Sequence, residues 1–156
     1  MAYGLKKQEL DKILTQHFLG HSVSRATATL PQSTVGNLFT VSTGRVLLTG
    51  IIGEVTTVIQ TQANNTKIVF DPTVTGANVD LCAILDITAD AIGTLYSITG
   101  TVANAMLSGF AVQAQLTPIV LQPGAIALSC SASSTGSVKW DMWYLPLDTG
   151  AMVAAV

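Results

Sequence analysis

Two histidines, His17 and His21, stand four residues apart near the N-terminus of this 156-residue chain. On a helix this spacing places both imidazoles on one face, where they could hold a metal ion. The glutamate that follows the first histidine in zinc-dependent hydrolases is absent, and no third ligand stands at a matching spacing. Nor can either histidine be paired with a nucleophile to make a catalytic triad. We therefore expect no metal site and no nucleophilic catalysis here.

Four aspartates, Asp71, Asp80, Asp86 and Asp90, fall within twenty residues of one another. Paired carboxylates could act as general acid and base or could bind calcium. Their spacing matches no calcium loop, and acids at strand ends and turns usually cap turns or face solvent. A small hydrolase that works through these acids therefore has little support. The expectation is that the chain is not an enzyme and carries no cofactor.

Two further motifs also favour structural roles. Gly50-Ile51-Ile52-Gly53 lacks the spacing and the lysine of a phosphate-binding loop, and a glycine within a strand pattern usually marks a bulge. Cys82 and Cys130 lie in apolar surroundings, and the charged N-terminus does not read as a secretion signal. We predict two buried thiols that pack as small hydrophobic groups, without a disulfide.

Charge is scarce and unevenly placed. Charged residues make up 10% of the chain and hydrophobic residues 49%, which favours an oligomer whose subunits cover surface that a monomer would expose. Residues 1–25 carry a net charge of +2 and the remainder −4. So few cations argue against direct nucleic-acid binding. Even the apolar stretch at 119–128 is interrupted by Pro123 and Gly124, so we expect no membrane span and a chain that stays where it is made.

The elements that would position these residues begin with a predicted N-terminal arm, residues 1–30. Between Leu5 and Leu19 apolar residues recur at three- and four-residue spacing, which predicts a short amphipathic helix. Gly20 stands where a left-handed residue commonly ends a helix, and an extended linker is expected after it. The apolar stripe needs a partner, either the chain's own body or another subunit. The stripe consists of Leu10, Ile13, Leu14 and Phe18.

Beyond Pro31 the composition changes to the threonine, valine and isoleucine typical of strands separated by turns. This predicts a mainly β body over residues 31–150, a single antiparallel β-sandwich or jelly-roll-like domain, followed by a tail at 151–156 that is either a contact segment or disordered. The expected strands cover 37–42, 45–52, 54–62, 67–71, 79–87, 94–99, 116–121, 125–132 and 137–145.

Alternation is clearest in the last of these strands, at 137–145. Val138, Trp140, Met142 and Tyr144 are expected to face the core. Trp143 is expected on the opposite face, where it could cover a second layer or contact another subunit.

Three runs of sequence, at 46–67, 79–88 and 124–147, resemble proteins encoded among the structural genes of tailed bacteriophages. The resemblance covers most of the body and is strongest for head decoration, or capsid cement, proteins. It implies a virion component made in the host cytoplasm, a β-rich homotrimer seated on the outer face of the major capsid protein lattice, and N-terminal arms that reach neighbouring subunits. The residues expected to make capsid or subunit contacts are Leu10, Ile13, Leu14, Phe18 and Trp143.

A second hypothesis is a virion adhesion or receptor-binding module, because β-sandwiches often bind carbohydrate through exposed aromatic and acidic side chains. Trp143 and Tyr96 are the aromatic candidates. Aromatic residues are only 6% of the chain, and no loop gathers several of them with acids, which counts against this hypothesis.

Overall fold

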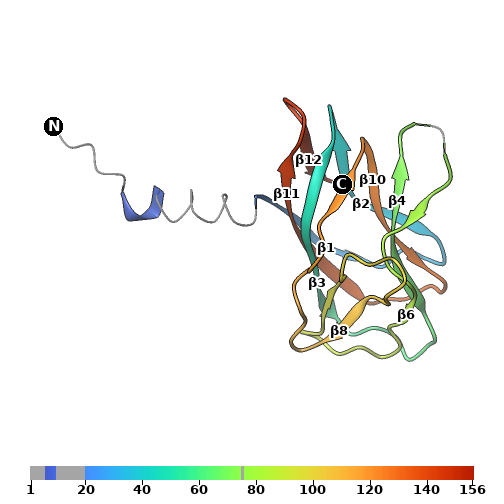
Figure 1. Ribbon diagram of the computed structural model, residues 1–156. Coiled ribbons are helices and arrows are strands. Elements are labelled where there is room, and N and C mark those ends of the chain that lie inside the picture. Colours follow the sequence, from blue (N-terminus) through green and yellow to red (C-terminus); the bar gives the residue numbers. More distant parts are fainter. Residues whose placement is uncertain (1–5, 10–19, 75) are drawn as a thin grey trace.

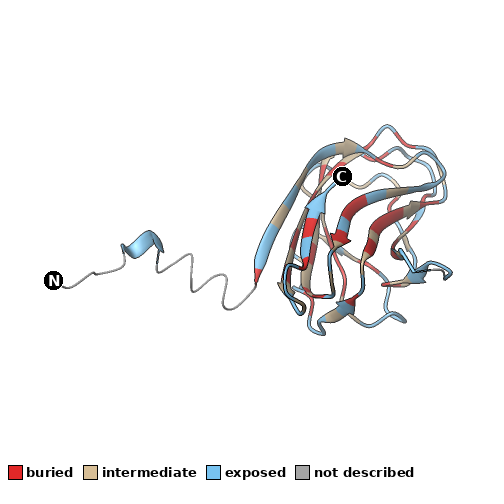
Figure 2. Ribbon diagram, turned by 90° about the horizontal axis from the view of Figure 1, so that it is seen from above, coloured by how far each residue is buried: buried red, intermediate tan, exposed pale blue. Residues whose placement is uncertain are grey.

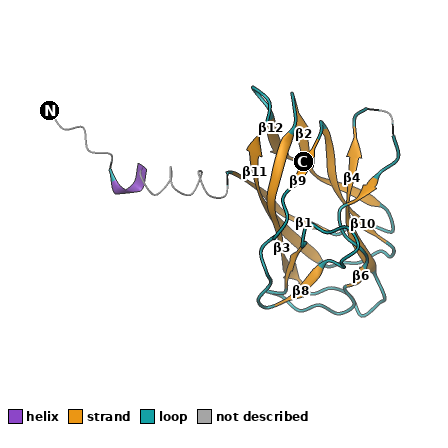
Figure 3. Ribbon diagram, in the orientation of Figure 1, coloured by secondary structure: helices purple, strands orange, loops and turns teal. Residues whose placement is uncertain are grey.

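The computed structural model describes residues 6–9, 20–74 and 76–156. It is mainly β, with 52% of the chain in strands and almost no helix, as the composition predicts. The strands form two antiparallel sheets of six strands each (Figures 1 and 3). Residues 7–9 form one turn of helix. The rest of the predicted helix, including Leu10, Ile13, Leu14 and Phe18, lies outside the described residues.

The first sheet contains the longest strands and has the order β1-β11-β3-β7-β8, with β9 also paired to β3. Strand β11 lies between β1 and β3 along most of its length, so its backbone groups are hydrogen-bonded on both sides. The strands are β1 (His21–Thr29), β3 (Val46–Thr57), β7 (Leu95–Ser97), β8 (Leu107–Gly109), β9 (Ile119–Leu121) and β11 (Ser137–Pro146).

The second sheet has the order β12-β2-β10-β4-β5, with β6 also paired to β4. Strand β10 is its central strand and pairs with β2 on one side and β4 on the other. The strands are β2 (Val35–Ser42), β4 (Asn65–Pro72), β5 (Val79–Asp80), β6 (Leu85–Asp86), β10 (Gly124–Cys130) and β12 (Met152–Ala155).

The segment after Gly20, expected as a linker, is instead part of the first sheet. It is extended, but it is the edge strand β1, paired with β11 from His21↔Tyr144 to Thr29↔Ser137. An edge strand buries little of its length, so its polar sequence lacks the alternation that identifies interior strands. The tail is likewise ordered, because Met152–Ala155 forms strand β12 against β2.

Other predicted strands differ in their limits. The two strands expected at 45–52 and 54–62 are joined in the single strand β3, since Gly53 continues the ladder opposite Trp140. Strand β3 ends at Thr57, so residues 58–62 are not in a strand. The strand expected at 79–87 is two short pieces, β5 and β6, each paired to β4. The strand expected at 116–121 begins only at Ile119, because the backbone N–H groups of Leu116 and Thr117 both donate to the Thr99 carbonyl oxygen and not to a strand ladder.

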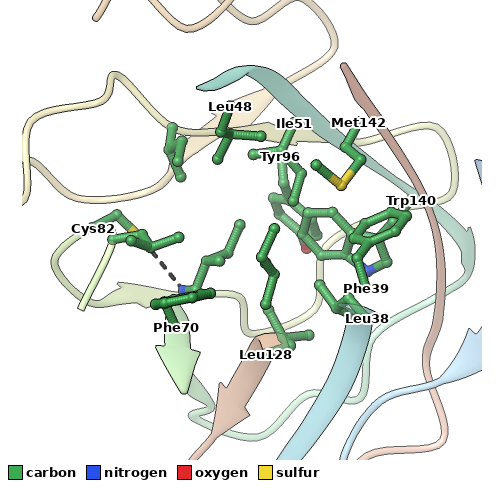
Figure 4. Close-up of a cluster of buried hydrophobic side chains, with 14 of the residues drawn as sticks. Leu38, Phe39, Leu48, Ile51, Phe70, Cys82, Tyr96, Leu128, Trp140 and Met142 are labelled. Carbon is green, nitrogen blue, oxygen red and sulfur yellow. Dashed lines mark hydrogen bonds between the residues drawn. The ribbon is translucent and has the colours of Figure 1, made fainter. Parts of the chain in front are cut away.

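One hydrophobic core lies between the two sheets. Trp140, Met142, Tyr96, Leu48 and Ile51 from the first sheet face Phe39, Phe70 and Leu128 from the second (Figure 4). Val138, Trp140, Met142 and Tyr144 are all buried, which confirms the predicted inward face of β11. In Figure 2, buried residues alternate with less buried ones along the strands of both layers. This alternation arises because successive side chains of a strand point to opposite faces of its sheet.

Candidate interaction surface

Of the four aspartates singled out in the sequence, Asp80, Asp86 and Asp90 each have a local structural partner, whereas Asp71 is exposed on β4. Asp80 pairs with Lys67, with Oδ2 2.7 Å from Nζ. Asp86 Oδ1 accepts hydrogen bonds from the Thr88 hydroxyl at 2.6 Å and from the Asn64 backbone N–H at 2.9 Å, and these lower its pKa. Asp90 accepts a hydrogen bond from the hydroxyl of Tyr96 at 2.6 Å. These carboxylates brace turns and do not form an acid–base pair.

His21 lies against the ring of Tyr144, with the ring centroids 5.6 Å apart, and His17 lies outside the described residues. Within 6–9, 20–74 and 76–156, no three side chains of histidine, cysteine, aspartate or glutamate gather closely enough to hold a metal ion.

Both cysteines are free and buried, as predicted. The Cys82 Sγ accepts a hydrogen bond from the backbone N–H of Ile68 at 3.3 Å (Figure 4), and the Cys130 Sγ accepts one from the Thr66 hydroxyl at 3.8 Å. Burial raises the pKa of both thiols, that of Cys130 to about 11. Neither sulfur is therefore a reactive thiolate near neutral pH.

Tyr96, one of the two aromatic candidates for sugar binding, is in the core. Its side chain is 1% exposed and its ring stacks beside Trp140 at a centroid distance of 6.4 Å. The sequence-based hypothesis that Tyr96 offers an exposed binding face is therefore wrong. The hydrophobic pattern around it was too short to decide which way the side chain points.

Trp143 lies on the outer face of the first sheet, as the alternation predicts. Its neighbours across the ladder are Gly50 on β3 and Ser22 on β1. A Cβ added to Gly50 would stand 3.6 Å from Trp143 Cε3, so the indole ring lies beside this glycine. Trp143 is only partly buried and leaves part of a large apolar ring accessible from outside.

Beside Trp143 the first sheet has a gap. Strand β3 pairs with β9 through residues 46–48 and with β7 through residues 52–54, so the two ladders end on either side of Gly50. On the other side, Trp143 pairs with Gly50 while Tyr144 pairs with Leu48, so Thr49 is the extra residue of a β-bulge. Bulges bend strands and redirect side chains, and they are common next to binding sites.

A hollow of about 250 Å³ occupies this gap. We call it the Trp143 hollow. Strand β3 supplies its floor, Trp143 one wall, and the connection from β8 to β9 the other. It is lined by Thr49, Gly50, Ile51, Ile52, Ala114, Gln115 and Trp143.

The β8–β9 connection contributes Ala114 and Gln115 to the lining of the hollow, and Gln115 is the polar one of the two. Gln115 is 9% exposed. Its Nε2 donates to the carbonyl oxygens of Thr117 at 2.8 Å and Leu48 at 3.3 Å. These bonds fix the orientation of the side-chain amide. A flipped amide would place Oε1 against two carbonyl oxygens, which cannot donate a hydrogen bond. The Oε1 atom is buried and has no hydrogen-bond partner. A buried acceptor without a hydrogen bond lowers the free energy of unfolding by about 1–3 kcal/mol.

The β8–β9 connection, residues 110–118, also carries exposed apolar side chains. Phe110 and Leu116 are each 74% exposed, and Ile92, whose neighbour Gly93 lies beside the Phe110 ring, is 60% exposed. We call Ile92, Phe110 and Leu116, together with the Trp143 hollow, the attachment surface. Apolar groups that are exposed together as one patch are typical of protein interaction sites.

A second apolar hollow, of about 300 Å³, lies where β5 and β9 approach from different sheets. Val79 and Val120 on its rim are 51% and 56% exposed. The residues that line it are Phe70, Pro72, Val79, Leu81, Ile119, Val120, Leu121 and Gln122. Gln122 is the only residue with a side-chain amide in this lining.

Comparison with known proteins found no match among protein-family models, curated proteins or solved structures. In the part of the chain that the structure describes, no helix is long and apolar enough to cross a membrane.

Sequence reasoning identified Trp143 but missed Gln115 and the hollow. Gln115 follows Ala114 in a stretch without regular alternation, and its neighbours come from β3 and β11, which are distant in sequence. The signal that could have pointed to the hollow is Gly50, because a glycine inside a strand often marks a bulge or a place where a ligand approaches closely. The contact candidates Leu10, Ile13, Leu14 and Phe18 lie outside the described residues, so the structure does not bring them together with Trp143.

Proposed function

We propose that the chain is a structural binding protein that decorates a protein lattice, and that the lattice is the head of a tailed bacteriophage. The observation that carries this proposal is the attachment surface, on which Phe110 and Leu116 are each 74% exposed in a chain with only 10% charged residues. Apolar surface of this kind is stabilised by a partner that covers it. The partner would be the major capsid protein, and the chain would act without catalysis.

The body supports this role as a rigid unit. We take the two sheets as the layers of a β-sandwich, because the buried residues of both contribute to a single core. Such a body can carry a binding surface without changing shape. The low charge favours self-association, and the resemblance to decoration proteins suggests a homotrimer, in which several modest capsid contacts would act together.

The N-terminal arm supports attachment from a second point. Gly20, with a φ of 86°, lies against the backbone of Tyr144, so the segment before it joins the first residue of β1 at a fixed position. We propose that the segment from Leu5 to Leu19 forms the amphipathic helix expected from the sequence, and that it contacts a neighbouring subunit through Leu10, Ile13, Leu14 and Phe18. A marginal helix of this length would gain its stability from that contact.

The first test is co-sedimentation with phage capsids assembled without this protein. Saturable binding, followed by greater resistance of the capsids to heat or chelator, is the result expected. Leu116→Ser should weaken binding, whereas Val74→Ser, on a loop of the other sheet and 64% exposed, is the matched control. Failure of the wild-type protein to sediment with capsids would exclude the decoration role.

A second test addresses the arm. Deletion of residues 1–19 leaves β1 intact, whereas a longer deletion would remove part of β1 and disturb the sheet. The truncated protein should remain folded, with unchanged circular dichroism, and should lose most of its capsid binding. Full binding by the truncated protein would exclude the arm as an attachment element. Sedimentation of the full chain as a 16.2 kDa monomer would exclude the trimer.

The adhesion module remains a second candidate because Trp143 offers an aromatic face beside a hollow. Because Tyr96 is buried, only Trp143 remains of the two aromatic residues expected to contact a sugar in this candidate function. Glycan-array binding by the wild-type protein and its loss in Trp143→Ala would favour this candidate over decoration.

A further inference from the structure

We infer that the β8–β9 connection, residues 110–118, is a strap that detaches from the first sheet as one unit while both sheets stay folded. In the proposed assembly, a partner seated on Phe110 and Leu116 holds this connection against the sheet. The effect of the partner rests on the proposed function, whereas the detachment rests on the contacts of the connection itself.

The connection packs little apolar surface against the sheet. The structure describes all of residues 110–118, and within this range only Gln115 is buried, while Val112 is partly buried. Phe110 and Leu116 are each 74% exposed. Segments with few buried apolar contacts open locally at a lower free energy than the core of a domain. We therefore expect the connection to open before the sheets unfold.

Backbone groups of the connection bond to β7 and to the turn after it. The Ser97 hydroxyl on β7 donates to the carbonyl oxygen of Gln113 at 2.6 Å. The backbone N–H groups of Leu116 and Thr117 share one acceptor, the Thr99 carbonyl oxygen, at 3.2 and 3.1 Å. In the detached state these groups would bond to water, so each bond adds only a modest net stabilisation.

Gln115 is a weak fastening. Its Nε2 reaches the sheet through the Leu48 carbonyl oxygen at 3.3 Å, whereas its shorter bond, at 2.8 Å, joins it to Thr117 within the connection. The bond to Thr117 can therefore persist after detachment. The Oε1 atom is buried without a hydrogen-bond partner in the attached state. Detachment lets water hydrate this oxygen, which offsets the loss of the long bond to Leu48.

Strand ladders limit the motion at both ends of the connection. Strand β8 pairs with β7 up to Gly109, and β9 pairs with β3 from Ile119 onward. The detached state keeps both ladders and moves only the residues between them. The connection also forms one wall of the Trp143 hollow, so detachment opens the floor of the hollow to solvent. A partner that contacts both Phe110 and Leu116 spans the connection and favours the attached state.

Amide hydrogen exchange in the full-length, ¹⁵N-labelled protein tests the detachment. The amides of Leu116 and Thr117, the connection amides, report on residues 110–118. Val55 and Leu81, whose backbone N–H groups each donate a 2.9 Å hydrogen bond, report on the first and second sheets. We expect the connection amides to be protected about a hundredfold less than the two reference amides. Equal protection of all four, or connection amides as unprotected as in a free peptide, would overturn the inference.

A matched pair of variants tests whether the connection moves as a unit. Ser97→Ala removes the bond to Gln113 and should speed exchange of both connection amides about tenfold, although these amides bond to Thr99. The control is Ser108→Ala, which removes an exposed hydroxyl on β8 that lies 3.5 Å from Asp90 and should leave both rates unchanged. Unchanged rates in Ser97→Ala would show that the residues open independently and would overturn the inference.

A third variant, Gln115→Met, tests the weak fastening. It removes the bond to Leu48 and the unsatisfied oxygen together while keeping a side chain of similar length. Exchange of the connection amides should change by less than about threefold, because the two effects oppose each other. Acceleration of about tenfold or more would mean that the Gln115 amide holds the connection in place, and would overturn its assignment as a weak fastening.

Exchange in capsid-bound protein tests the effect of the partner. Mass spectrometry of peptides that cover residues 110–118 should show about tenfold slower exchange on capsids than in the free protein. Capsid binding with unchanged exchange would overturn the role of the partner in holding the connection. Failure to bind capsids would overturn the decoration role, and exchange in the free protein would still decide whether the connection detaches.

Discussion

Gly53 lies directly opposite Trp140 in the ladder between β3 and β11, and the indole ring covers its α-carbon. A Cβ at position 53 would stand 2.8 Å from both Cη2 and Cζ3 of Trp140. Trp140 is itself 1% exposed, so any shift of its ring would disturb the packing of the core around it. Trp140, the largest side chain of the core, thus fits only because Gly53 on the neighbouring strand has no side chain.

This relationship predicts that Gly53→Ala destabilises the protein by about 1–3 kcal/mol, the usual cost of overpacking a closed core. Gly50→Ala is the matched control, because its added Cβ would meet Trp143 only at 3.6 Å, an ordinary contact. Its effect should stay within about 0.5 kcal/mol. Urea unfolding midpoints of both variants and the wild type provide the measurement, and equal midpoints for the two variants would contradict the prediction.

Tyr96 predicts a loss of stability at alkaline pH. Burial, with the hydrogen bond to Asp90, raises the pKa of its hydroxyl far above the ordinary value of 10.0. The folded state therefore holds this proton more tightly than the unfolded state. The resulting stabilisation is complete below about pH 10 and is lost as the pH rises further, since the unfolded chain can then release the proton.

The variant Tyr96→Phe tests this pH dependence because it cannot ionise. At pH 8 it should be less stable than wild type by about 1 kcal/mol, owing to the lost hydrogen bond. At pH 11 the difference should shrink or change sign. Urea titrations at the two pH values measure the difference, and a gap that does not depend on pH would refute the role assigned to Tyr96.

The pair Arg45–Asp148 predicts a loss of stability in acid. The guanidinium and the backbone N–H of Arg45 donate to the Asp148 carboxylate at 2.7–3.0 Å and lower the pKa of Asp148 to about 2. Its stabilisation is present above the ordinary value of 3.8 and is lost as the pH falls toward 2. Asp148→Asn should therefore lower the unfolding midpoint at pH 7 and have much less effect at pH 2.

The control for this variant is Asp71→Asn, an exposed residue on β4. It should change the midpoint little at either pH. A midpoint for Asp148→Asn that follows the wild-type curve at pH 7 would mean that this exposed pair contributes nothing to holding the turn before β12 in place.

The burial of both thiols predicts that they react with a thiol reagent only when the protein is unfolded. Cys82 and Cys130 are 1% and 4% exposed, so neither should react with a thiol reagent such as DTNB in native protein at pH 8, and both should react in urea. Rapid reaction of one thiol in buffer would mean that its part of the core opens readily. Mass spectrometry of the labelled peptides identifies which cysteine reacted.

The sequence alone determined the features that depend on local pattern. The turn and strand residues after Pro31 predict a mainly β chain, and alternation in 137–145 predicts that Trp140 is buried and Trp143 faces outward. The apolar neighbours of the cysteines predict buried thiols. These properties follow from side-chain periodicity and composition, which each strand carries within its own few residues.

Only the tertiary structure decided which strands are neighbours, and with that the site. Strand β1 is an edge strand whose sequence reads as a linker, because one unpaired edge and a mostly exposed face leave no hydrophobic pattern. The Trp143 hollow requires Gly50, Gln115 and Trp143 from three separate segments to meet at a gap in the sheet. A contact of this kind depends on strand order and register, and neither is specified by the residues on any one strand.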